Sequence, residues 1–72
     1  PDADGVPPGV FQEMIKKLPD GYRTVLNLYV FENKSHKEIA TLLNIKATSS
    51  ASQLFHAKAM MAKMIKEYKR TQ

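Results

Sequence analysis

The segment SHKEIATLLN, residues 35–44, restricts the possible folds of this chain most, because it signals both the start and the end of one short helix. Ser35 and Glu38 have the spacing of a capping box, in which each residue accepts a hydrogen bond from the backbone amide of the other. Asn44 follows the last apolar position, and asparagine tolerates the left-handed conformation of a tight turn after a helix. The residues expected to face the core are Ile39, Leu42 and Leu43, and Ile45 is expected to re-enter it after the turn.

A longer helix is expected after this turn, beginning between Lys46 and Ser49 and continuing to about Lys69. Thr48 or Ser49 can cap its start. Residues at steps of three and four define an inward stripe: Ser50, Leu54, Ala57, Met61, Met64 or Ile65, and Tyr68. A short helix, a tight turn and a longer helix together are the layout of a helix-turn-helix, whose second helix can enter the major groove of DNA.

Two further helices are predicted in the N-terminal half. Apolar residues at helical spacing indicate one from about residue 9 to Leu18, and residues 20–31 form a second that is apolar nearly all round, as a helix in the middle of a small bundle is. The run VLNLYVF has strand propensity, but the chain offers no second strand to pair with it. The fold class is therefore all-α, a small bundle of about four helices containing the helix-turn-helix.

The domain is expected to span residues 10–72, with the last residues frayed. Residues 1–9, PDADGVPPG, are rich in proline and glycine and are expected to form a linker or flexible arm. The chain begins without methionine, so we expect it to be a domain excised from a longer protein.

Charge is divided unevenly along the chain. Residues 1–32 carry a net charge of −2 and residues 33–72 a net charge of +6, within a total of +4. A basic half joined to an acidic half would turn its basic end toward a polyanion such as nucleic acid. For the lysines alone, a solvated helix surface is the more common explanation.

Several classes of chemistry are disfavoured by what the sequence lacks. Without cysteine there is no disulfide and no thiol nucleophile, which fits a reducing compartment, and we expect a cytoplasmic location. The two histidines stand far apart in sequence, so no metal site is expected. There is no glycine-rich phosphate loop, nucleophile elbow or apolar run long enough to span a bilayer. We therefore expect a protein that is not an enzyme, holds no cofactor and does not span a membrane.

The residues of the longer helix that remain after its inward stripe is removed are candidates for DNA binding. Ser and Gln side chains can bond to base edges, and an apolar ring can pack on a thymine methyl group. These candidates are Ser49, Ala51, Ser52, Gln53, Phe55, His56 and Lys58. Lys37, Lys46 and Lys58, with the amides at the start of the short helix, suit phosphates.

Each of these residues also has a simpler explanation. Phe55 can equally belong to the core, because aromatic side chains in small bundles are more often packed than displayed. His56 can be an ordinary surface histidine, and His36 is expected to be solvated or to face phosphate. The methionines at positions 60, 61 and 64 are most simply core gap-fillers, with a sticky surface for a partner protein as the alternative.

The motifs together resemble a known family. The opening LP-x-x-Y-R at residues 18–23, the helix pattern S-x-K-E-I-A-x-x-L and the segment TSSASQLFHAK resemble region 4 of bacterial sigma factors, specifically the extracytoplasmic-function type. This resemblance implies recognition of the promoter element near position minus thirty-five. It also implies docking on the flap of the RNA polymerase β subunit, possible control by an anti-sigma factor, and action as a monomer.

Carried over residue by residue, the resemblance assigns base reading to four positions and backbone contacts to three. The base-reading positions are Ala51, Ser52, Phe55 and His56, and the backbone positions are Ser49, Lys58 and Lys37. The chain departs from the family pattern where Asn44 replaces the usual glycine and where Ala51 and His56 replace residues that are often basic. Lys46 stands where the family often caps the recognition helix with serine.

Two rival functions remain open at this point. In the first, the same helices form a protein-interaction module that binds RNA polymerase or an anti-sigma regulator after its DNA reading has decayed; Ala51 and the methionine-rich tail favour this alternative. In the second, the chain is an ordinary helix-turn-helix repressor domain that dimerises on a two-fold operator.

Overall fold

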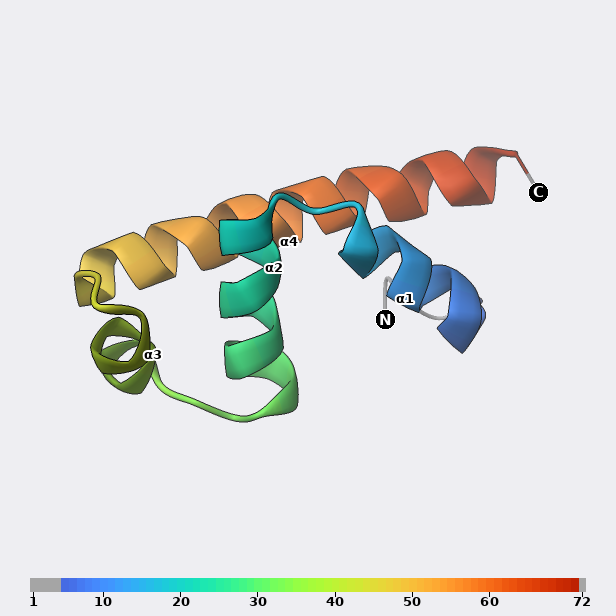
Figure 1. Cartoon of the computed structure of the whole chain (residues 1–72). Coiled ribbons are helices and arrows are strands. Elements are labelled where there is room, and N and C mark those ends of the chain that lie inside the picture. Colours follow the sequence, from blue (N-terminus) through green and yellow to red (C-terminus); the bar gives the residue numbers. More distant parts are fainter. Residues whose placement is uncertain (1–4, 72) are drawn as a thin grey trace.

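The computed structural model describes residues 5–71 and contains four α-helices and one π-helical turn within that range. In chain order these are α1 (Pro8–Lys16), α2 (Asp20–Leu26), the π-helical turn η1 (Asn27–Phe31), α3 (His36–Leu43) and α4 (Ala47–Arg70). Figure 1 shows α1, α2 and α3 along one side of the long helix α4. No strand occurs among residues 5–71, so the predicted all-α class is confirmed.

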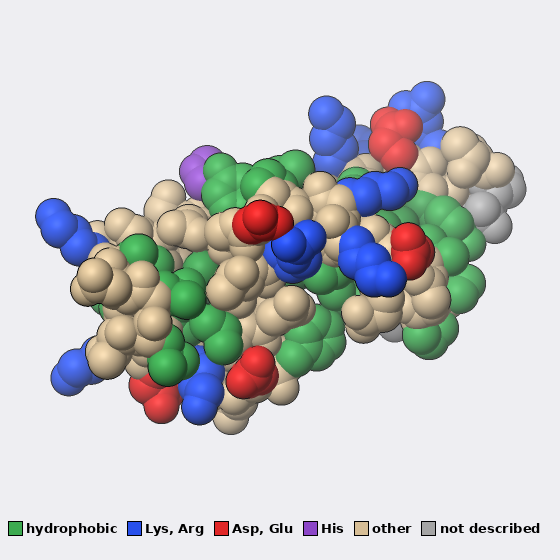
Figure 2. All heavy atoms as spheres, viewed as in Figure 1, with side chains coloured by type: hydrophobic (Ala, Val, Ile, Leu, Met, Phe, Trp, Pro, Cys, Tyr) green, Lys and Arg blue, Asp and Glu red, His purple; other side chains and the backbone are tan. Residues whose placement is uncertain are grey.

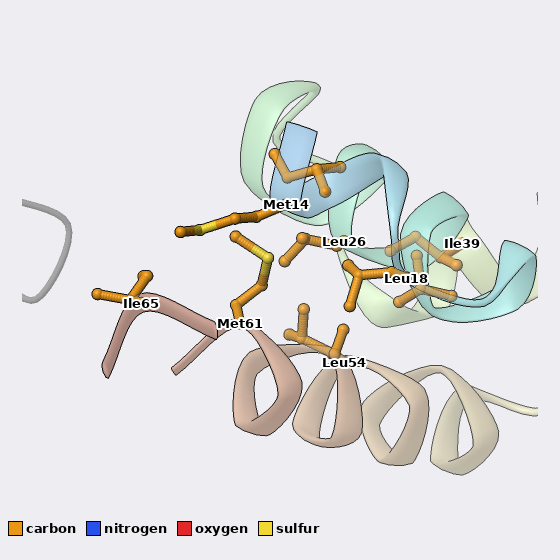
Figure 3. Packing of buried hydrophobic residues seen from close by; sticks show 10 residues of the cluster. Met14, Leu18, Leu26, Ile39, Leu54, Met61 and Ile65 are labelled. Carbon is orange, nitrogen blue, oxygen red and sulfur yellow. The ribbon is translucent and has the colours of Figure 1, made fainter. Parts of the chain in front are cut away.

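The core lies between α4 and the three shorter helices. In Figure 3, Leu18, Leu26 and Ile39 lie together over Leu54 of α4, and Met14 of α1 lies beside Met61 of α4. On α4 the predicted inward stripe is confirmed. Its buried members are Ser50, Leu54, Ala57, Met61 and Ile65, with Met64 and Tyr68 partly buried beside them. Because α1, α2 and α3 all pack on α4, the position of each short helix is set by its contact with α4.

The capping box of α3 is confirmed. The Ser35 amide donates to Glu38 Oε1 at 2.9 Å, and the Glu38 amide donates to Ser35 Oγ at 3.1 Å. At the other end of α3, Asn44 has φ 56° and ψ 48°, the left-handed conformation expected of it. The Ile45 amide then donates to the Ala40 carbonyl at 3.0 Å, which closes the turn. The helix-turn-helix geometry therefore follows from the residues that predicted it.

The start of α4 differs from the prediction. Neither Thr48 nor Ser49 caps the helix, because α4 already begins at Ala47, with Lys46 at the N-cap in an extended conformation. The Ser50 amide donates to the Lys46 carbonyl at 3.0 Å, so both candidate caps lie inside the first turn. No side chain caps this helix start.

The first helix also has different bounds from those expected. It starts at Pro8, two residues inside the predicted linker, because proline is tolerated in the first helical turn, where its missing N–H has no partner to lose. It ends at Lys16 rather than Leu18, yet Leu18 is buried in the turn that follows. The part of the predicted linker formed by residues 1–4 lies outside the described residues.

Residues 20–31 were expected to form a helix in the middle of the bundle, and this is wrong for the last turn of that helix. In η1 the helix widens, with the Glu32 amide donating to the Asn27 carbonyl five residues earlier at 3.1 Å. Val25 and Leu26 are buried against α4, whereas Val30 is 50% exposed and Phe31 is 55% exposed. The apolar run is longer than the part of α2 that the other helices cover.

Leu42 was expected to face the core and does not. It is 59% exposed, because in so short a helix Ile39 and Leu43, four residues apart, already occupy the row that faces the bundle. Ile45 is only half-buried. Within residues 5–71, no helix combines the length and the hydrophobicity that crossing a membrane requires.

Candidate nucleic-acid interface

The outward face of the N-terminal half of α4 carries three of the predicted base-reading residues. Ala51, Ser52 and Phe55 are all exposed there. Phe55 is 69% exposed, so the alternative that it belongs to the core is wrong. Leu54 fills the inward position instead, and each further residue of a helix turns the side chain by about 100°.

His56 is exposed but is held against α2. Its ring stacks on Tyr22 with centroids 5.7 Å apart and an interplanar angle of 24°. The ring of Phe55 meets His56 edge-on, with centroids 5.6 Å apart and an angle of 75°. Three aromatic rings thus form a row, Tyr22–His56–Phe55, that runs from α2 to the outward face of α4.

Gln53 and Ser49 do not share the outward face of Phe55. Both are half-buried, one turn apart. A Cβ atom placed on Gly21 would come within 2.9 Å of Gln53 Oε1, so the Gln53 amide lies against the first turn of α2. The structure therefore separates the exposed residues Ala51, Ser52 and Phe55 from Gln53, which lies against α2, and from the half-buried Ser49.

The three predicted phosphate-binding lysines are all exposed. Lys37 and Lys46 are exposed near the starts of α3 and α4. Lys58 is also exposed, with Nζ 5.9 Å from the centroid of the Tyr29 ring, a distance compatible with a cation–π contact.

The ion pairs found among residues 5–71 leave these three lysines free. They join Glu13 to Lys16, Asp20 to Arg23 and Glu67 to Arg70. Figure 2 shows acidic and basic side chains beside one another over α1 and the C-terminal half of α4, where two of these pairs lie. Within the described part of the chain, none of these ion pairs engages the positive charge of Lys37, Lys46 or Lys58.

His36 has a structural role that the sequence did not reveal. Its Nδ1 atom lies 2.9 Å from Ser50 Oγ, and its ring stacks on Tyr29 with centroids 4.6 Å apart. Ser50 is 0% exposed, so this hydrogen bond is made inside the contact between α3 and α4. The expectation that His36 is solvated or faces phosphate is wrong. A serine on an inward stripe was the available signal, because a buried hydroxyl needs a hydrogen-bond partner.

Two backbone amides at the start of α3 already donate hydrogen bonds to side chains of the same helix start. The pKa of Glu38 lies below its ordinary value, chiefly because its carboxylate accepts the Ser35 backbone hydrogen bond, and further because of the Ser35 side chain and nearby Lys34. The amides of Ser35 and Glu38 are both bonded within the capping box. Lys37, rather than these two amides, is therefore the candidate phosphate contact of α3.

Beside Lys37, α3 carries a hollow of about 400 Å³ that is also lined by Thr41 and Leu42. A groove of about 400 Å³ lies between α1 and the C-terminal half of α4, lined by residues such as Val10, Met14 and Tyr68. Within residues 5–71, no three histidine or acidic side chains come close enough together to hold a metal ion. The arrangement is suited to binding an extended surface.

The fold and this face define a class of protein, the helix-turn-helix DNA-binding domains. A family model described as "Sigma-70, region 4" matches residues 9–61, which is more than half of the chain. The chain therefore belongs to the sigma-70 region 4 family, and the predicted family is confirmed. This family binds DNA and works with RNA polymerase in transcription, and it is not a catalytic family. No match was found among curated proteins or among solved structures.

Proposed function

We propose that this domain recognises the promoter element near position minus thirty-five within an RNA polymerase holoenzyme, by placing the N-terminal half of α4 in the major groove. One observation carries the proposal. Ala51, Ser52 and Phe55 are exposed on one face of α4, while the opposite face is buried against the rest of the bundle. An α-helix with its side chains is about 10–12 Å across, which matches a major groove of about 12 Å.

The proposed mechanism separates reading from positioning. Ser52 offers a hydroxyl to base edges, and the small side chains of Ala51 and Ser52 allow α4 to approach the groove floor closely. Lys37, Lys46 and Lys58 neutralise phosphates on either side of the groove and fix the register without reading sequence. His56 is close enough to this face to contact bases while remaining stacked on Tyr22.

The proposal includes partners. The domain docks on the flap of the polymerase β subunit, acts as a monomer on one non-palindromic site, and is a target for an anti-sigma factor. These expectations come from its membership of the sigma-70 region 4 family.

A selection of random-sequence DNA duplexes by the purified chain at low salt, followed by sequencing, tests the proposal. We expect enrichment of one non-palindromic motif, because a single recognition helix would read it. A palindromic motif would instead indicate a dimeric repressor.

A second function is supported by exposed apolar residues away from this face. Val30 and Phe31 in η1 and Leu42 in α3 are each at least half exposed, an arrangement typical of protein contacts. In this alternative the domain binds polymerase or a regulator and reads DNA weakly. Salt-sensitive DNA binding without an enriched motif, together with loss of polymerase binding in Phe31→Ser but not in Met60→Ser, would favour it.

A further inference from the structure

Phe55 and Ala51 form an apolar spot on the face that we propose enters DNA. Among the described residues, Phe55 is the most exposed of the large hydrophobic side chains, at 69%. Ala51 is exposed one turn earlier, and residues four apart on a helix lie above one another on the same face. The spot therefore offers a ring and a methyl group side by side to whatever binds there.

The Phe55 ring is supported from behind. The edge-on contact with His56 and the stacking of His56 on Tyr22 link it to α2, and Tyr22 is half-buried in the bundle. Aromatic contacts of this kind add stabilisation beyond the area that they bury. The ring is thereby held in place before a ligand arrives, which lowers the entropy lost on binding.

The charges around the spot indicate what kind of ligand fits it. The first half of α4, ATSSASQLFHAK, contains no acidic residue, and Lys46 and Lys58 stand at its two ends. The fitting ligand is therefore anionic and carries an apolar group within reach of its charges. In the major groove of DNA the thymine C5-methyl group is the apolar group on the base edges.

We infer that the domain selects thymine through its C5-methyl group, which packs against Phe55 and Ala51. This inference rests on the proposed function and adds the base that is read and the atoms that read it. Neither Phe55 nor Ala51 can hydrogen-bond to guanine, so this part of α4 distinguishes bases by their apolar surface.

Deoxyuridine provides the test, because it differs from thymidine only by lacking the methyl group. In the duplex enriched by the selection, each thymine is replaced in turn by uracil and affinity is measured by titration. At one or two positions we expect about a fourfold loss, the effect of removing one buried methyl-sized group. Replacing T·A at such a position by 5-methylcytosine·guanine is expected to lose less affinity than replacing it by cytosine·guanine.

Substitutions in α4 show whether Phe55 is the residue that contacts the thymine methyl group. In Phe55→Ala the uracil substitution is expected to have a clearly smaller effect, since only Ala51 then remains to contact the methyl group. Met60→Ala, which truncates another exposed apolar side chain of α4, is expected to retain the fourfold difference. The melting temperature of each variant confirms folding, which Phe55→Ala should preserve because the side chain is exposed.

The outcomes separate this inference from the function on which it rests. An enriched motif whose affinity does not change with uracil at any position overturns the inference and leaves promoter reading in place. A uracil effect that is undiminished in Phe55→Ala also overturns it. If no motif is enriched, the proposed function fails, and the thymine contact fails with it.

Discussion

The starts of α3 and α4 differ in how their backbone amides are satisfied. Every α-helix begins with amides that have no partner inside the helix. At α3 the Ser35–Glu38 capping box satisfies two amides there, whereas α4 begins after Lys46 with no side-chain cap. The short helix thus carries its own start signal. The start of α4 has instead the tertiary contact between His36 and Ser50, and no side chain bonds its first amides.

The charged side chains at the two helix starts add to the difference between α3 and α4. Glu38 places a negative charge in the first turn of α3, where it is favourable, whereas Lys46 places a positive charge at the start of α4, where the helix dipole disfavours it by about 0.3–1 kcal/mol. A phosphate at this position would interact favourably with both the lysine and the amides. If α4 enters DNA as proposed, its start suits the DNA-bound state better than the free state.

The largest expected effect concerns the hydrogen bond between the two helix starts. His36→Ala should lower the free energy of unfolding by about 1–3 kcal/mol, because it leaves the Ser50 hydroxyl buried without its partner. Urea unfolding of His36→Ala, Ser50→Ala and the double variant measures this. We expect strong coupling; additive effects would mean that the hydrogen bond does not hold α4 in place.

The capped start of α3 can be compared directly with the uncapped start of α4 through one substitution in each. Ser35→Ala should lower the free energy of unfolding by about 1 kcal/mol through loss of the α3 cap. The matched variant Thr48→Ala, in the first turn of α4, should change it by less than about 0.5 kcal/mol, because this exposed side chain caps nothing. Equal losses in the two variants would remove the difference between the helix starts.

The capping box should also make stability depend on pH. The folded-state pKa of Glu38 is lowered from 4.5, so its contribution is present above that value and is lost as pH falls through the folded-state pKa. Glu38→Gln can keep the reciprocal hydrogen bonds but does not titrate. In urea titrations from about pH 6 to about pH 3, the wild type should therefore lose stability relative to Glu38→Gln. A constant difference between them would contradict this.

The smallest effect on stability is a gain. Lys46→Ser should raise the free energy of unfolding by about 0.5–1 kcal/mol, because it supplies α4 with a cap and removes an unfavourable charge. The same change should weaken binding to all DNA sequences alike and reduce the slope of log affinity against log salt by about one. A loss confined to one sequence would show that Lys46 contacts a base.

Local patterns predicted much of this architecture. The capping box, the Asn44 turn and the inward stripe of α4 depend on residues a few positions apart, and each is present. The His36–Ser50 hydrogen bond and the contact of Gln53 with α2 depend on how two helices cross, which residue spacing does not encode. The exposure of Leu42, Val30 and Phe31 likewise depends on how far the other helices extend over them.

Gly21 has a consequence for how the specificity of such a domain can change. It lies in the first turn of α2, where alanine would favour the helix by up to about 1 kcal/mol. A methyl group there would push against Gln53 Oε1, the mobile end of its side chain, and displace an amide of the type that recognises adenine. Under the proposed function, a substitution on α2, outside the DNA contact, would alter which groups α4 offers to the bases and so change the promoter preference.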